Sequence, residues 1–333
     1  MTGGSPMELV CPAGTPAALR AAVQAGAGAV YCGFRDGTNA RNFPGLNFSV
    51  AEMAEGVRFA HAHGARVLVA INTFARVGEV DLWLGAVDAA AACGADAIIA
   101  SDVAVLDHVA SNHPEVNLHL SVQAAAATPE AIGFYARTFG VRRVVLPRVL
   151  SVQEIAALNR NIDVETEAFV FGGLCVMIEG RCHLSSYATG RSPNLNGVCS
   201  PPEAVSYDED RHGVAARLSG FTIDRYAQGE PADYPTLCKG RFRAGDKTGY
   251  LFEDPVSLNA GSLIAGLKAA GVTALKIEGR QRGKAYVGEV VRAFRRALDA
   301  VEMGSDAVEI DRILAGQSEG GRQTTGAYKK TWR

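Results

Sequence analysis

Several features of membrane, secreted and nucleic-acid-binding proteins are missing from this sequence of 333 residues. No apolar run approaches the roughly 20 residues that a membrane-spanning helix needs. Residues 1–6 contain neither the basic nor the apolar segment of a signal peptide. The net charge is −2, which indicates no general attraction to nucleic acid or anionic membranes. We therefore expect a cytoplasmic protein that keeps its cysteines reduced.

Motifs that would assign common hydrolase, zinc or dinucleotide chemistry are also missing. No His-Glu-x-x-His segment occurs, and we expect no serine-hydrolase nucleophile elbow. No two cysteines stand at the close spacing by which structural zinc sites pair their ligands. The first apolar run is followed by Pro12–Thr15 rather than by Gly-x-Gly-x-x-Gly, which disfavours a dinucleotide-binding open sheet.

Short apolar runs alternate with helical patterns along most of the chain, and this alternation is typical of a parallel sheet with right-handed crossovers. The sequence predicts strands at Glu8–Cys11, Ala29–Gly33, Arg66–Ile71, Asp96–Ala100, Asn117–Ser121, Arg143–Leu146, Val164–Phe171 and Ala274–Ile277. It predicts helices at Thr15–Ala25, Ala51–His63, Val80–Cys93, Ser151–Leu158, Ser257–Ala270 and Gly283–Met303, with two more beginning near Asp102 and Thr128.

Eight such units favour an α/β fold of the TIM type, a (β/α)8 barrel, over a doubly wound open sheet. The pattern breaks in a stretch rich in Gly, Pro, Ser, Arg and Cys, which we interpret as an insertion after strand seven. The predicted organisation is a flexible extension (1–7), the first seven barrel strands (8–171), the cysteine-rich insertion (172–254), the last barrel units (255–310) and an irregular tail (311–333).

Four of the seven cysteines lie in or beside this insertion, as Cys175, Cys182, Cys199 and Cys238, in the pattern C-x6-C-x16-C-x38-C. Four reduced thiols in one region indicate a soft-metal site. From spacing alone, an iron–sulfur cluster, a zinc ion and incidental buried cysteines all remain open. Because the insertion leaves the C-terminal end of a strand, it is expected at the end of the barrel where active sites form.

Polar residues follow several predicted strands at that same end. The candidates for catalysis are Glu167, Arg148 and Glu278, and those for substrate binding are Arg35, Arg41, Asn72, Gln123 and Arg280. Convergent arginines would suit a dicarboxylate, because guanidinium binds carboxylate through two hydrogen bonds. The alternative for each arginine or glutamate is an ordinary surface ion pair. Glu167 stands out because its strand position can face inward, where a carboxylate is costly without a partner.

The segment EAFVFGGLCVMIEGRCHLS (Glu167–Ser185) resembles the signature of the collagenase-like peptidase family U32. Gly173 stands where the family usually has Ser or Ala, which exchanges one small residue for another. The stretches LPRVLSVQEI and LKIEGRQRGKAYV are similarly characteristic of the family. Within it, the segments Gly180–Pro201 and Tyr234–Arg241 are most similar to the UbiU branch, which serves oxygen-independent ubiquinone biosynthesis.

This resemblance implies a 4Fe-4S cluster held by Cys175, Cys182, Cys199 and Cys238. It also implies a hydroxylase subunit that forms a heterodimer with a UbiV-like homologous partner and acts on a polyprenylated ubiquinone precursor. Prephenate would donate the oxygen, and a lipid-carrier protein such as UbiT would present the isoprenoid substrate. The alternative on the same scaffold is an RNA-base hydroxylase, although those relatives carry further C-terminal domains. Peptidase activity is disfavoured, because the best-placed nucleophilic cysteines are the ones assigned to the cluster.

Overall fold

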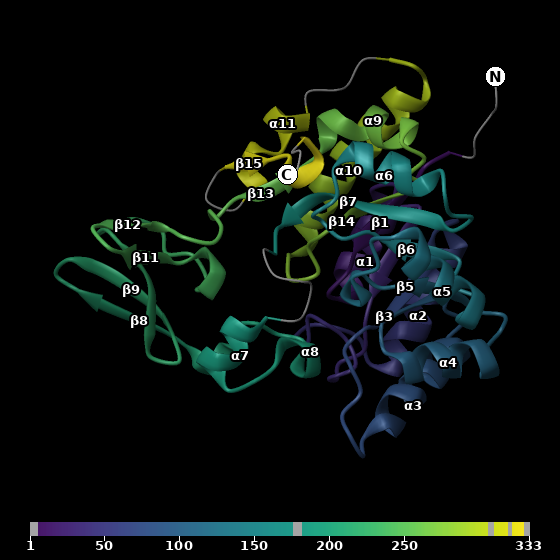
Figure 1. The fold of residues 1–333 in the computed structure, drawn as a ribbon, viewed down its shortest axis with the longest axis horizontal. Coiled ribbons are helices and arrows are strands. Elements are labelled where there is room, and N and C mark those ends of the chain that lie inside the picture. The colour runs from purple at the N-terminus through teal and green to yellow at the C-terminus, as the bar shows by residue number, and fades with distance from the viewer. Residues whose placement is uncertain (1–5, 176–181, 306–309, 319–321, 330–333) are drawn as a thin grey trace.

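Eight parallel strands form a closed barrel in the computed structural model, which describes residues 6–175, 182–305, 310–318 and 322–329. They are β1 (Glu8–Pro12), β2 (Ala29–Cys32), β3 (Arg66–Ile71), β4 (Ala97–Ala100), β5 (Asn117–Leu120), β6 (Arg143–Val145), β7 (Glu165–Gly173) and β14 (Ala274–Ile277). Each strand pairs with the next, and β14 closes the ring by pairing with both β7 and β1 (Figure 1). The predicted barrel is therefore confirmed, and the open sheet is excluded.

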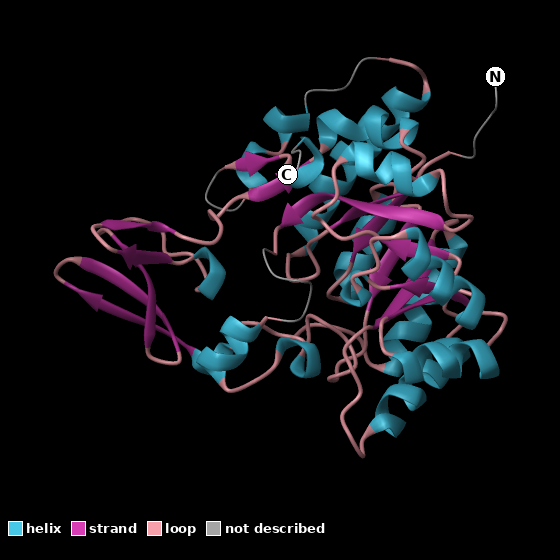
Figure 2. Cartoon of the chain, viewed as in Figure 1, coloured by secondary structure: helices cyan, strands magenta, loops and turns pink. Residues whose placement is uncertain are grey.

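Helices surround the strands (Figure 2). They are α1 (Pro16–Gln24), α2 (Val50–Ala62), α3 (Val80–Ala92), α4 (Val103–Asn112), α5 (Pro129–Phe139), α6 (Val152–Asn159), α9 (Ile264–Ala269) and α10 (Lys284–Glu302). Ser49 and Ser151 begin α2 and α6 with reciprocal capping boxes. The main core packs helices on strands, while a smaller apolar cluster fills the barrel interior. No helix in the described part of the chain is both long and apolar enough to cross a bilayer.

The segment between β7 and β14 contains small elements that the sequence pattern did not predict. They are α7 (His183–Thr189), α8 (Pro193–Asn196), the antiparallel sheet of β8 (Val205–Asp210), β9 (Gly213–Leu218) and β10 (Phe221–Tyr226), and the hairpin of β11 (Arg241–Ala244) and β12 (Lys247–Tyr250). These sheets extend away from the barrel at the left of Figure 1. They escaped prediction because strands such as β8, mostly exposed and charged, carry little hydrophobic alternation.

The predicted helix Ser257–Ala270 is wrong at its start. Ser257–Asn259 form strand β13, which pairs antiparallel with the end of β7, and α9 begins only at Ile264. The Asn259 side chain accepts a hydrogen bond from Gly261 N at 3.0 Å, which favours a turn at this point over a continuous helix. Strand pairing thus overrides the local helical pattern.

Parts of the C-terminal tail, which was predicted to be irregular, form short elements. Helix α11 (Ile310–Ile313) is followed by strand β15 (Gln323–Thr324), which pairs with β13. The Tyr328 side chain is buried, and its hydroxyl donates to the carbonyl oxygen of Phe169 in β7 at 2.6 Å. The tail therefore contacts the barrel strand that leads into the cysteine-rich segment.

Removing the Tyr328 contact should destabilise the barrel in two measurable steps. Tyr328→Phe deletes one buried hydrogen bond and should lower the free energy of unfolding by about 1 kcal/mol. Tyr328→Ala also leaves a cavity and should cost roughly 3–5 kcal/mol. Urea denaturation measures both, with the exposed Lys329→Ala as control. Equal stability of Tyr328→Ala and the control would contradict this account of the tail.

Candidate active site

A cavity of about 170 Å³ lies at the mouth of the barrel, between the C-terminal ends of the strands and the cysteine-rich segment. Most of the predicted site residues line it: Arg41, Asn72, Gln123, Arg148, Cys175, Cys182, Cys199, Cys238, Glu278 and Arg280. They come from segments up to about 240 positions apart in sequence, and barrel closure brings them to one place.

The four cysteines reach this cavity from different local structures. Cys175 follows β7 by two residues, and the Cys182 sulfur caps α7 by accepting a hydrogen bond from Ser185 N at 3.4 Å. Cys199 lies after α8, and Cys238 is in the 3-10 turn Leu237–Lys239. Burial raises the pKa of the Cys238 thiol to about 12, and the charges of the other three thiols add to this shift. The mutual influence reflects how closely the four gather.

Four thiols that line one cavity offer donors for a soft metal ion or an iron–sulfur cluster. All seven cysteines are reduced. Within the described residues, no three of the four cavity sulfurs lie within 4.8 Å of one another.

Positively charged side chains also line the cavity. Glu278 accepts a hydrogen bond from Arg41 Nε at 3.2 Å and lies 3.7 Å from the Arg148 guanidinium. Burial alone would raise the pKa of the Glu278 carboxyl, but the nearby arginines hold it below its usual value. Arg280 is also buried and donates to Asn39 at 3.1 Å. Three guanidinium groups face one carboxylate, so the cavity has a surplus of positive charge that suits an anionic ligand.

Two amide side chains complete the polar lining. Asn72 accepts a hydrogen bond from Ala40 N at 2.9 Å and donates to the Ser121 hydroxyl at 3.2 Å. Gln123 lies in a 3-10 turn after β5, and its buried Oε1 has no hydrogen-bond partner among the described residues. A buried, unpartnered amide oxygen is costly unless a ligand or water satisfies it. Gln123 therefore offers an acceptor to a bound molecule.

Lys276 is the cavity residue that sequence reasoning missed. It stands in the apolar strand β14, its ammonium lies 2.5 Å from Glu167 Oε1, and it faces the Tyr31 ring at 3.9 Å. Glu167 itself is fully buried and does not line the cavity, so in this structure it positions Lys276 and does not face the ligand space. A lysine within an apolar strand was the available signal, because an inward-facing charge needs a buried partner.

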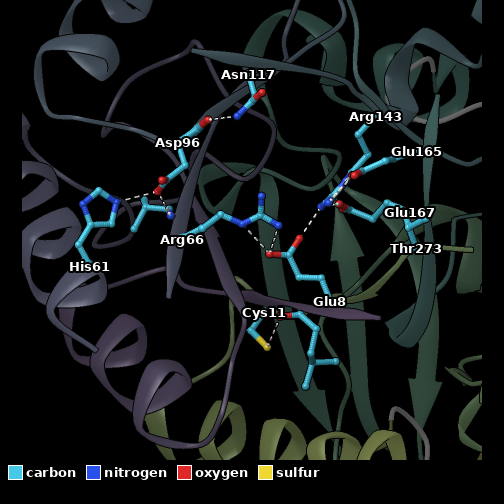
Figure 3. A network of polar contacts seen from close by, with 12 residues as sticks. Glu8, Cys11, His61, Arg66, Asp96, Asn117, Arg143, Glu165, Glu167 and Thr273 are labelled. Carbon is cyan, nitrogen blue, oxygen red and sulfur yellow. Dashed lines mark hydrogen bonds and ion pairs between the residues drawn. The ribbon is translucent and has the colours of Figure 1, made fainter. Parts of the chain in front are cut away.

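A network of ion pairs extends from Glu167 into the barrel (Figure 3). Arg143 contacts Glu8 and Glu165 at 2.6 Å each and Glu167 at 3.4 Å. Burial lowers the pKa of the neighbouring His119 to about 3, and the charge of Arg143 adds to this effect. His119 is therefore neutral. Glu167 connects this network to Lys276, which lines the cavity.

Arg35 lies outside the cavity, contrary to prediction. Its half-exposed guanidinium pairs with Glu52 at 2.8 Å and donates to the carbonyl oxygen of Asn47 at 3.1 Å. The loop after β2 turns between Arg35 and Arg41, and only Arg41 reaches the barrel mouth. Strand spacing alone does not distinguish two arginines of the same loop.

Two histidines converge on the outer face of the barrel. His108 and His113 each contact the same carboxylate oxygen of Asp88 at 2.7 Å. Their ligand atoms lie close enough together to hold a metal ion. This group joins α3 and α4 and does not line the cavity.

The letters Gly-x-Ser-x-Gly do occur once, at residues 316–320, although no nucleophile elbow was expected. Ser318 follows a 3-10 turn at Ala315–Gln317, whereas an elbow serine follows a strand. Its hydroxyl donates to the carbonyl oxygen of Leu314 at 3.3 Å. The local structure therefore differs from that of a serine-hydrolase nucleophile.

Comparison with known proteins identifies one family along almost the whole chain. The model of peptidase family U32 matches residues 14–326. The chain is 31% identical to tRNA hydroxylation protein P1 of Bacillus subtilis, covering 88% of this chain and 63% of that protein. It is 32% identical to the 23S rRNA 5-hydroxycytidine C2501 synthase of Escherichia coli, covering 94% of this chain and 42% of that protein. It is 30% identical to a collagenase of Porphyromonas gingivalis, covering 88% of this chain and 66% of that protein. The chain thus spans two thirds or less of these three relatives.

Substitution of Glu167 should destabilise the protein far more than substitution of Glu165 on the same strand. Glu167→Gln leaves the buried Lys276 ammonium without its carboxylate partner, which should cost roughly 3–5 kcal/mol of unfolding free energy. Glu165→Gln breaks a half-exposed pair and should cost less than about 1 kcal/mol. Urea denaturation at pH 7 compares the two variants, and equal losses would contradict the assignment.

The effect of Glu167 should also depend on pH with a defined sign. Lys276 and Arg143 overcome the opposing effect of burial and hold the pKa of the Glu167 carboxyl below its ordinary value of 4.5. Its contribution to stability is therefore complete above pH 4.5 and is lost as the pH falls through the lower folded value. The difference in unfolding free energy between wild type and Glu167→Gln should become smaller over that acidic range. A difference that stays constant would argue against an ionised Glu167.

Proposed function

Because the chain belongs to peptidase family U32, we propose that it is an oxygen-independent hydroxylase that binds a 4Fe-4S cluster through Cys175, Cys182, Cys199 and Cys238. The observation that carries this proposal is the meeting of four thiols and three arginines around one cavity at the barrel mouth. When bound, the cluster would supply electron transfer beside the cavity. The names of the RNA-hydroxylating relatives support hydroxylation as the type of reaction.

The charged wall of the cavity supports an anionic oxygen donor, for which we propose prephenate. Arg148 and Arg280 would bind its carboxylates, with Arg41 kept in place by Glu278. Gln123 would accept a hydrogen bond from the donor's hydroxyl group, and Lys276 would stand ready to move a proton at that oxygen. An aryl C–H becomes C–OH with loss of two electrons. The donor exchanges its hydroxyl group for that hydrogen atom and gains the two electrons, so atoms and electrons balance.

For the acceptor we propose a polyprenylated ubiquinone precursor, as in the UbiU branch of the family. A UbiV-like partner subunit and a lipid carrier such as UbiT would then assist. The similar segments at Gly180–Pro201 and Tyr234–Arg241 support this choice, although residues 180 and 181 lie outside the described residues.

The second candidate is hydroxylation of an RNA base. It is favoured by the names of the Bacillus and Escherichia relatives, which cover most of this chain. The same cavity would then receive a base extruded from its stack, and the arginines would bind phosphate or the oxygen donor. The two candidates differ in the acceptor and share the cluster and the hydroxylation chemistry.

Metal analysis of anaerobically purified protein tests the cluster. Wild type should contain about four iron and four sulfide per chain, with a broad visible absorption. Alanine substitution of Cys175, Cys182, Cys199 or Cys238 should sharply lower both contents, while Cys93→Ala, outside the cavity, should retain them. Zinc in place of iron, or unchanged iron in the four variants, would refute the proposal.

A deletion strain grown without oxygen separates the two acceptors. We expect it to accumulate an unhydroxylated prenylated precursor, detected by lipid mass spectrometry, with its ribonucleoside profile unchanged. Complementation with Arg35→Ala should restore the quinone, because that side chain lies outside the cavity. Arg280→Ala should restore less than about a tenth, since a lost carboxylate contact costs about 1.4 kcal/mol or more. A missing RNA modification with normal quinone would support the second candidate instead.

A further inference from the structure

A second and larger space lies outside the barrel mouth. This outer cleft has a volume of about 510 Å³ and is lined by the loop Phe43–Leu46, strand β10, the segment Asp233–Thr236 and residues Gln281 and Arg282. Its walls thus come from the loops after β2 and β14 and from the cysteine-rich segment. No cysteine lines it, and it lacks the Arg41–Arg148–Glu278 group of the inner cavity.

The outer cleft and the inner cavity are connected. A passage of about 140 Å³ shares lining residues with both spaces. With the outer cleft it shares Phe43, Thr236, Lys239, Gln281 and Arg282, and with the inner cavity it shares Arg41, Arg148, Cys175, Cys199 and Glu278. A molecule seated in the outer cleft can therefore direct one end toward the thiols and arginines.

Size indicates that the two spaces serve different molecules. Pockets for drug-sized ligands typically measure about 300–1,000 Å³, and only the outer cleft falls within that range. The inner cavity measures only about 170 Å³, and the cluster proposed for its four cysteines would share that space with a small ligand. A hydroxylation between two substrates needs both at once, so a larger acceptor needs room outside the inner cavity.

We propose that the outer cleft binds the body of the acceptor as a neutral aromatic ring carrying an apolar tail, with the reacting ring edge directed through the passage. This inference rests on the proposed hydroxylase function. Aromatic and apolar side chains form much of the wall, among them Phe43, Leu46, Ile223, Tyr226 and Tyr234. Such flat surfaces suit an uncharged ring and hydrocarbon.

Several acidic groups around the outer cleft are paired with arginines of the same chain. Asp224, on its wall, is buried and pairs with Arg241, so that carboxylate is neutralised within the protein. Strand β8 stands beside the cleft, because Tyr207 donates to the carbonyl oxygen of Asp233 at 3.3 Å. At the exposed end of β8, Asp208 pairs with Arg217 and Asp210 pairs with Arg225, so these carboxylates are also neutralised within the protein. Lys239 and Arg282 lie where the cleft meets the passage, toward the donor site.

Binding of 2-geranylphenol to anaerobically purified full-length protein tests the outer cleft. Pro44→Trp adds bulk from an exposed loop position on the wall, and Tyr234→Ala removes an aromatic surface. Each should weaken geranylphenol binding at least about tenfold in isothermal titration. Val77→Trp adds similar bulk at a fully exposed position outside the cleft and should bind as wild type. Visible absorption and prephenate binding should be unchanged in all three variants.

The outcomes separate this inference from the proposed function. Geranylphenol affinity that is unchanged in both Pro44→Trp and Tyr234→Ala would overturn the outer-cleft assignment, as would displacement of the probe by a cytidine oligonucleotide. Iron-containing protein that does not bind geranylphenol would refute the cleft alone. Protein without iron that still binds geranylphenol, with loss in the two variants, would refute the cluster and leave the cleft assignment standing.

Discussion

The pairing of β7 with β14 closes the barrel, and the candidate site depends on that seam. The register places Ala274 beside Glu167 and Lys276 beside Phe169, so the Glu167–Lys276 ion pair crosses between the two strands. Beyond the seam, β7 leads to Cys175 and β14 leads to Glu278 and Arg280. Closure therefore brings the thiols and the arginines to one small cavity.

Backbone contacts hold the cysteine-rich segment against this mouth through protein groups alone. Gly172 has φ +111, and a Cβ there would lie 2.6 Å from the Glu278 carbonyl oxygen, so glycine lets the two strand ends approach. Gly197 accepts a hydrogen bond from Arg41 N at 2.8 Å and has no room for a side chain beside Asn39. The segment thus carries Cys175 and Cys199 to the cavity on contacts that do not involve the thiols.

Much of the fold could be predicted because strands and helices of a barrel bury regular patterns. Capping residues such as Ser49 and Ser151 locate helix starts within one residue. Strands β13 and β15 could not be predicted, since each is only two or three residues long and exists through its partner. Lys276 escaped notice because the strand around it is apolar. Its ion pair with Glu167 joins β14 to β7 and is visible only in the structure.

The sequence by itself determined the barrel, the family and which four cysteines lie near the barrel mouth. Strand periodicity and a motif with fixed spacing are local properties of the chain. Only the tertiary structure decided that Arg41 and not Arg35 reaches the cavity, and that Lys276 pairs with Glu167. It alone revealed the outer cleft, whose walls come from three distant segments. These distances depend on loop paths and ring closure, which no local pattern encodes.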